Sequence, residues 1–410
     1  MMASSEGGMK KRVAILIPNL RNGGAERVAS NLSYTLAKDY EVYMVVYDGS
    51  NPDYHHGGSL INLHSEPTAN PVKKLWKLLD RVRRLKQIKK THQIHATISF
   101  MEGPNVVNIL SRADDRIIVS VRIFKTLSVG GFYVSLQKQL MKKWYNRADL
   151  VVAVSEIIKK DLIENFAIRA EKVRSIYNAY DVSAIQKLGS MPLESEYEDI
   201  FLHPVLINAG RLTTQKAQWH LIRAFKRVKE EVKDAQLVIL GDGGLNTYLQ
   251  ELAMGLGLEE SVHLLGFQRN PFRFLCKASA FVFPSMFEGF PNALCEAMAC
   301  GLPVIASDCK SGPREILAPT SCLDRVCKEV EIAEFGILVP LCDGTRYEAE
   351  DVLTKEEEGL AEAMIDILTN KMLQEKLKEA SLVRAKELSV EDIYKEWLAV
   401  IENHEGLVYE

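Results

Sequence analysis

The sequence has no long hydrophobic run. None of its 410 residues fall in an apolar stretch near the ~18–20 residues that a membrane-spanning helix needs. The amino terminus, MMASSEGGMKKR, is basic but is not followed by the apolar core and cleavage site of a secretory signal. The run at 13–18 is too short and indicates a strand instead. These absences predict a cytoplasmic protein.

Cysteine is missing from the first half of the chain. All seven cysteines lie between Cys276 and Cys342. An odd number at scattered spacing argues against a disulfide framework, and no CxxC pair has the spacing of a zinc site. We therefore expect reduced, mostly buried thiols and no structural zinc.

Charge is divided unevenly along the chain. Residues 1–190 carry 29 basic and 17 acidic side chains, whereas the remainder carries 22 basic and 37 acidic ones. This asymmetry indicates two parts with different partners, and the basic part favours an anionic surface such as phospholipid, a lipid diphosphate or nucleic acid. Nucleic acid is the poorest of these, because no RNA-binding motif is present and the isoelectric point is near 6.4.

Short apolar runs recur along both halves, and helical patterns separate most of them. This alternation predicts an α/β protein with parallel sheets covered on both faces by helices. We expect doubly wound domains at 1–188 and 201–375, a polar linker at 189–200 and a helical segment at 376–410. The strand candidates are 11–18, 41–47, 96–100, 117–121, 150–154, 205–209, 236–240, 261–265, 280–283 and 303–306.

Two glutamates follow the strand that ends near Pro284. Ligands of open parallel sheets bind beyond the carboxyl ends of strands, so unusual residues there are site candidates. Glu288 lies in the loop, and a helix is predicted to begin at about Pro291, where free N–H groups suit a diphosphate. Glu296 lies ~7 Å farther along that helix, within reach of a ribose diol. The alternative is that both glutamates are exposed surface residues, as isolated glutamates usually are.

Two cations follow the first strand of the second half. Arg211 and Lys216 in NAGRLTTQK suit two phosphate groups, although a solvated basic loop is the simpler reading of that segment alone. Glycine-rich turns follow two further strands, at 241–244 and at 23–24, where a backbone without side chains can approach a ligand closely. Neither turn is specific by itself.

Together these motifs resemble the retaining glycosyltransferases of family four, which have the GT-B fold. That fold consists of two Rossmann-like domains facing a central cleft, with a C-terminal helix returning to the first domain. The resemblance runs in order from about residue 12 to residue 345. Its motifs are GGAER (23–27), ADLVVAVSE (148–156), IYNAYD (176–181), GRLTTQK (210–216), LGDGG (240–244), EGFPNALCE (288–296) and CGLPVIASDCKSGPREI (300–316).

The resemblance implies a role for each matching residue. Arg211 and Lys216 would hold the donor diphosphate, and Glu288 would contact the donor sugar near the reacting centre. Glu296 would bind the ribose. The family needs no metal, and no convincing Asp-x-Asp site is present. The further donor-binding residues that it implies are Gly23, Gly24, Gly210, Phe290, Pro291 and Asn292.

A basic helical pattern at 72–90 distinguishes the first half. It has nine basic residues against one acidic residue, and apolar residues recur in it at three- and four-residue intervals. An ordinary surface helix packed on the sheet and a helix docked on an anionic membrane both remain open. Where many relatives carry a His after the strand at 117–121, this chain has Arg122, which could orient an acceptor or form a structural ion pair. The candidate acceptor-binding residues are Arg122, Lys73, Lys77 and Arg84.

The segment CKSGPREI resembles the subgroup that extends lipid-linked oligosaccharides. The sequence therefore predicts transfer of a hexose or N-acetylhexosamine from a nucleoside-diphosphate sugar, by family resemblance UDP-linked, to a polyprenyl-diphosphate-linked glycan. The protein is expected in the cytoplasm, peripheral on the inner face of the membrane. The alternatives are a nucleotide-sugar epimerase of the same fold, which needs no acceptor, and a non-catalytic carbohydrate-binding protein.

Overall fold

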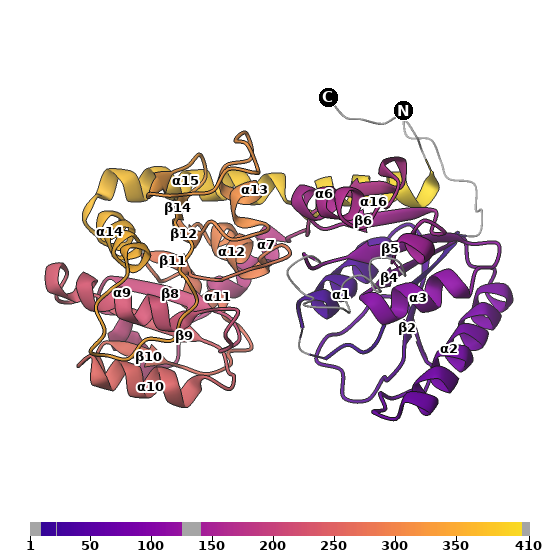
Figure 1. The fold of residues 1–410 in the computed structure, drawn as a ribbon, viewed down its shortest axis with the longest axis horizontal. Helices are drawn as coiled ribbons and strands as arrows, with labels where there is room; N and C mark the ends of the chain where they lie inside the picture. The colour runs from indigo at the N-terminus through magenta and orange to yellow at the C-terminus, as the bar shows by residue number, and fades with distance from the viewer. Residues whose placement is uncertain (1–9, 22, 125–140, 404–410) are drawn as a thin grey trace. The chain divides into compact units, whose positions relative to one another are not determined.

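The computed structural model describes residues 10–21, 23–124 and 141–403. The chain divides into two units (Figure 1). Unit 1 consists of Met1–Asn178 together with Val390–Glu410, and unit 2 consists of Ala179–Ser389. Each unit contains its own parallel sheet, as the alternation of apolar runs and helical patterns predicts.

Unit 1 is built on a seven-stranded sheet of order β3-β2-β1-β4-β5-β6-β7, and all neighbouring strands in it are parallel. Its central strands are buried along nearly their whole length, because helices cover both faces. The strands are β1 (Arg12–Ile17), β2 (Glu41–Val46), β3 (Ser59–Asn62), β4 (Ala96–Phe100), β5 (Arg116–Val121), β6 (Leu150–Ala153) and β7 (Val173–Ser175).

The C-terminal helix α16 (Val390–Glu402) packs in unit 1, which confirms its predicted return to the first domain. The Tyr40 hydroxyl donates to Glu402 Oε1 at 2.8 Å, and Arg116 Nε donates to the Val400 carbonyl at 2.8 Å. The other helices that the described part of unit 1 contains are α1 (Gly24–Leu36), α2 (Pro71–Thr91), α3 (Glu102–Leu110), α6 (Glu156–Glu164) and the short η1 (Ala170–Lys172).

Unit 2 has a second seven-stranded sheet, of order β10-β9-β8-β11-β12-β14-β13. It is parallel except for β13, which runs antiparallel to β14. The strands are β8 (Val205–Ala209), β9 (Gln236–Leu240), β10 (Val262–Leu264), β11 (Ala280–Phe283), β12 (Val304–Ser307), β13 (Glu331–Ile332) and β14 (Ile337–Val339).

Helix α9 (Gln218–Glu231) has nine buried residues, and Trp219 and Phe225 among them are fully buried in the core. It packs against α14 (Lys355–Thr369), as Figure 1 shows. The other helices are α7 (Val182–Gly189), α8 (Ser195–Glu198), η2 (Asp199–Leu202), α10 (Asn246–Gly255), α11 (Phe272–Leu275), α12 (Asn292–Ala299), α13 (Pro313–Leu317) and α15 (Lys371–Glu387).

The division into units differs from the predicted boundaries. The chain passes between units after Asn178 and again after Ser389, and the segment predicted as a linker at 189–200 belongs to unit 2. Residues of this segment make contacts there: Glu194 pairs with Arg273 at 2.6 Å, and Leu193 is buried. Among the described residues, no helix is both long and apolar enough to span a membrane.

Candidate donor site in unit 2

The candidate site lies at the carboxyl edge of the unit 2 sheet. Strand β11 pairs with β8 on one side and with β12 on the other, so the segments that follow these three strands meet. These segments are 210–216, 284–292 and 308–312. This edge is where a doubly wound sheet binds its ligands. The three segments contain the predicted unit 2 donor residues except Glu296, which lies on α12, the helix that follows the second segment.

Lys216 and Glu288 form an ion pair across this edge. Lys216 Nζ lies 2.6 Å from Glu288 Oε1, and it also lies 4.8 Å from the centre of the Phe283 ring. The Glu288 backbone is fixed by a hydrogen bond from its N–H to the Lys310 carbonyl at 2.8 Å and by a bond that its carbonyl accepts from the Ser311 N–H. Two of the three predicted catalytic side chains are therefore in contact.

Arg211 is exposed in the turn that follows β8. Among the described residues, no carboxylate pairs with its guanidinium. The turn is held by the Gly210 N–H, which donates to the Leu240 carbonyl, and the Leu212 N–H, which donates to the Asp242 carbonyl. Gly241 has φ +136°, and a Cβ there would lie 2.1 Å from the Gly210 carbonyl oxygen. The close approach of these two turns therefore requires glycine at 241.

Helix α12 places the second glutamate. Pro291 is its N-cap and Asn292 its first residue, one position later than predicted. Glu288 and Glu296 are each only 7% exposed, so the alternative of two surface glutamates is wrong. The Asn292 side chain accepts a hydrogen bond from the Tyr180 hydroxyl at 2.8 Å. The first turn of α12 leaves backbone N–H groups without intrahelical acceptors, beside a buried carboxylate and a lysine.

Comparison with known proteins identifies the family. Residues 22–184 match the description Glycosyltransferase Family 4, and residues 202–334 match Glycosyl transferases group 1. An uncharacterized glycosyltransferase of Methanocaldococcus jannaschii is 36% identical over 83% of this chain and 87% of its own length. The chain belongs to these glycosyltransferases.

A second relative has a named reaction. The N-acetylgalactosamine-N,N'-diacetylbacillosaminyl-diphospho-undecaprenol 4-alpha-N-acetylgalactosaminyltransferase of Campylobacter jejuni is 33% identical over 80% of this chain and 86% of its own length. Among solved structures, Anabaena HepE in complex with UDP and glucose has a TM-score of 0.72 at 17% identity, covering 96% of this chain and all of that one. The structural match shows that this glycosyltransferase has the GT-B type of fold.

The sequence did not single out the ion cluster beneath this site. Arg314, on α13 and 2% exposed, pairs with Asp308 at 2.6 Å and with Glu331 at 3.2 Å. Burial alone would lower the pKa of Arg314, but hydrogen bonds to Asp308 and Glu331 raise it above its usual value. The cluster fixes the segment after β12 that supports Glu288. The motif KSGPREI contains this arginine, but no local pattern indicates its partners Asp308 and Glu331.

The glycosyltransferase's cysteines are free thiols, as predicted. Burial, and next the charge of Glu288, raise the pKa of Cys309 well above its usual value, so it is a neutral thiol close to the ion pair. Among the described residues, no group of three or more His, Cys, Asp or Glu side chains could hold a metal ion.

The remaining candidates lie in unit 1. Gly23 and Gly24 begin α1, and their assignment to the donor stays a prediction. Arg122, after β5, donates to Asn178 Oδ1 and lies 5.6 Å from the Phe100 ring centre. The other three candidates are on α2. Lys73 is exposed, Lys77 donates to the Glu66 carbonyl at 2.5 Å, and Arg84 pairs with Asp80 at 2.8 Å.

Proposed function

We propose that the protein is a retaining glycosyltransferase that moves a hexose or N-acetylhexosamine from a UDP-sugar to a polyprenyl-diphosphate-linked glycan, without a metal ion. The observation that carries the donor half is the ion pair of Lys216 with the buried Glu288, together with the buried Glu296, at the carboxyl edge of the unit 2 sheet. UDP-bound structural neighbours support a uridine nucleotide.

The electrostatic difficulty of the reaction is the charge that develops on the departing diphosphate. Arg211, Lys216 and the N-terminal amides of α12 would stabilise that charge, and removal of one such contact typically costs ~3–4 kcal/mol. Glu296 would accept hydrogen bonds from the ribose hydroxyls, and Glu288 would hold Lys216 and contact the sugar. In retention, the acceptor oxygen bonds to the anomeric carbon on the face that the diphosphate leaves, and the acceptor proton passes to the leaving phosphate oxygen.

The acceptor assignment is supported by the Campylobacter relative, whose name gives a diphospho-undecaprenol substrate. Such an acceptor lies in a membrane, so the enzyme would work at the inner face of the cell membrane as a peripheral protein. Arg122 provides a fixed cation at the carboxyl edge of the unit 1 sheet, suited to the acceptor's phosphate.

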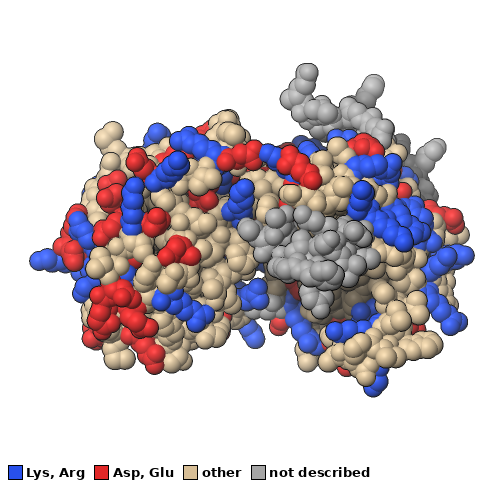
Figure 2. All heavy atoms as spheres, viewed as in Figure 1, with Lys and Arg blue, Asp and Glu red and all other residues tan. Residues whose placement is uncertain are grey.

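The surface of α2 supports membrane docking. Its apolar residues fall into two sets: Leu85 is buried in the unit 1 core with Leu78, Val82 and Ile88 packed against it, whereas a second set remains exposed. Exposed Lys73 and Lys74 lie between members of this second set in the sequence. Figure 2 shows more Lys and Arg than acidic residues over unit 1. The exposed set consists of Val72, Leu75, Trp76 and Leu79, each more than half exposed.

The donor reaction can be tested with purified enzyme, a panel of UDP-sugars and a synthetic polyprenyl-diphosphate glycan. We expect a lengthened lipid-linked product with the α configuration if the donor is α-linked. An isomeric UDP-sugar formed without acceptor would instead identify an epimerase. Binding of glycan with no turnover of any donor would identify a carbohydrate-binding protein.

Membrane docking can be tested by co-sedimentation with phosphatidylglycerol vesicles. We expect binding at low salt that weakens as salt rises, because screening reduces the attraction of exposed charges. Replacement of Leu75 and Trp76 by Ser should weaken it further, whereas Met254→Ser, at an exposed position of α10, should not. Absence of binding at low salt would contradict the membrane assignment.

A further inference from the structure

A long loop of unit 2 follows β14. It spans residues 341–354 and contains neither helix nor strand. Loops longer than ~12–15 residues without secondary structure are uncommon inside compact domains, and those that occur are often functional. This loop begins at the same carboxyl edge of the sheet as the candidate donor site.

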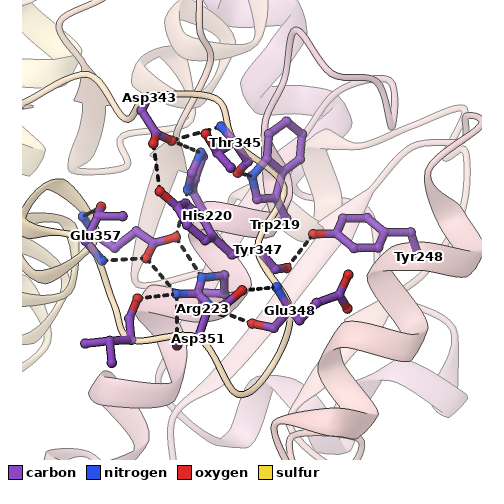
Figure 3. Close-up of polar contacts among 12 residues, drawn as sticks. Trp219, His220, Arg223, Tyr248, Asp343, Thr345, Tyr347, Glu348, Asp351 and Glu357 are labelled. Carbon is purple, nitrogen blue, oxygen red and sulfur yellow. Dashed lines mark hydrogen bonds and ion pairs between the residues drawn. The ribbon is translucent and has the colours of Figure 1, made fainter.

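Side chains of two helices bind the backbone of this loop. Trp219 Nε1, on α9, donates to the Thr345 carbonyl at 2.8 Å. The Tyr248 hydroxyl, on α10, donates to the Tyr347 carbonyl at 2.8 Å. The loop has no helix or strand of its own, and side chains of α9 and α10 hold its backbone in place (Figure 3).

Arg223 makes the largest number of these contacts. It is fully buried, and it donates to the carbonyls of Glu348 at 2.6 Å and Val352 at 2.9 Å, and more weakly to that of Asp351. Its Nε pairs with Glu357 Oε1 at 2.9 Å. Burial alone would raise the pKa of Glu357, but hydrogen bonds from His220 and Arg223 lower it below its usual value. The carboxylate is therefore charged, and the two buried charges compensate each other.

The other side of the loop contacts the donor segments. Arg346 Nη2 donates to Thr214 Oγ1 at 2.9 Å, and Thr214 lies between Arg211 and Lys216. Gly344 has φ +79°, and a Cβ there would lie 3.0 Å from the Met286 methyl group. The Met286 N–H in turn donates to the Gln215 carbonyl at 2.8 Å. The loop thus touches both the segment that carries Lys216 and the segment that leads to Glu288.

We propose that the 341–354 loop positions the 210–216 segment for donor binding, with Arg346 and Thr214 as positioning residues and Arg223 as the group that holds the loop. The proposal rests on the proposed function, because the donor is the ligand whose site is positioned. Arg346 and Thr214 are both exposed, so their contact contributes little to stability. Weaker donor binding in a variant whose Tm is unchanged would therefore show that the contact positions the donor segment and does not simply stabilise the fold.

The test is a double-mutant cycle on the full chain, with Arg346→Ala, Thr214→Val and the double variant. The readouts are UDP affinity by calorimetry, KM and kcat for the UDP-sugar, and Tm. We expect each single change to raise the Kd of UDP and the donor KM roughly threefold to tenfold, the effect of one hydrogen bond, with kcat and Tm little changed. The double variant should bind UDP as the weaker single variant does.

The matched control is Arg227→Ala. Arg227 is on the same helix as Arg223, but its ion pairs are with Glu230 and Glu231 on that helix, so the change should leave UDP affinity as in the wild type. If both single variants bind UDP as tightly as the wild type, or if the effects of the two changes are fully additive, the positioning role is overturned. The proposed function would not be affected by that result. Failure of the wild-type protein to bind any nucleotide or nucleotide-sugar would overturn the proposed function as well.

Discussion

Two lysine–carboxylate pairs, one in each unit, have similar geometry and different surroundings. Lys89 and Asp115 in unit 1 lie 2.9 Å apart with no exposed side-chain surface. Asn108 Oδ1 accepts a further hydrogen bond from Lys89, and the Thr97 hydroxyl donates to Asp115. Lys216 and Glu288 in unit 2 lie 2.6 Å apart, and 18% and 9% of their side-chain surfaces are exposed. The sealed pair stabilises the fold, whereas the accessible pair is available to a ligand.

The largest expected effect is on stability, at the sealed pair. Lys89→Ala leaves Asp115 as a buried charge without its cation, which should lower the free energy of unfolding by ~3–5 kcal/mol. Chemical denaturation measures this decrease in the free energy of unfolding. A variant as stable as the wild type would mean that the pair is not sealed from water.

The second effect is on turnover, at the accessible pair. Lys216→Ala should lower kcat about 10²–10³-fold, because one contact to the leaving diphosphate is lost. The unfolding free energy should change much less than in Lys89→Ala. If instead Lys216→Ala unfolds the protein while keeping the specific activity of the folded fraction, the distinction between the two pairs is wrong.

A smaller effect is expected at the other glutamate of the site. Glu296→Gln retains shape but weakens the acceptance of ribose hydrogen bonds, so the Kd for UDP should rise roughly tenfold. The effect should fall mainly on KM, whereas Glu288→Gln should lower kcat. Calorimetry and steady-state kinetics on the two variants separate these roles, and identical profiles would contradict them.

A further effect is a pH dependence of the sealed pair. Burial lowers the pKa of Lys89 to about 8, from 10.5 when unfolded. Between pH 8 and 10.5 the unfolded state therefore binds more protons, so the unfolding free energy should rise with pH in that window. Chemical denaturation of the wild type and of Lys89→Met across this range should show that the unfolding free energy of the wild type increases with pH relative to that of the variant. A constant difference would show that Lys89 does not titrate there.

Much of the sheets could be predicted because many strands are continuous apolar runs, as at 150–154 and 280–283, which burial on both faces favours. Strands β3, β7, β13 and β14 were not predicted. Each has only two to four residues, and β3, β7 and β13 lie at sheet edges. The segment at 189–200 has the composition of a linker, and only its tertiary contacts place it in unit 2.

The site was predictable where its geometry is local. Glu288 and Glu296 are eight residues apart, across one loop and one helix, so their relation follows from the helical rise. The contact of Lys216 with Glu288 spans 72 residues and depends on β8 lying beside β11, which no local pattern reveals. Likewise, periodicity placed Leu75 and Leu85 in one stripe of α2, whereas the structure exposes the first and buries the second.

The central claim is that unit 2 holds the donor and that its fixed cations stabilise the leaving diphosphate. Arg211→Ala tests it most directly, because Arg211 is exposed and its loss should not disturb folding. We expect an unchanged Tm and a loss of transfer from the UDP-sugar of at least about 100-fold. A wild-type rate of transfer in that variant would contradict the donor site described for this glycosyltransferase.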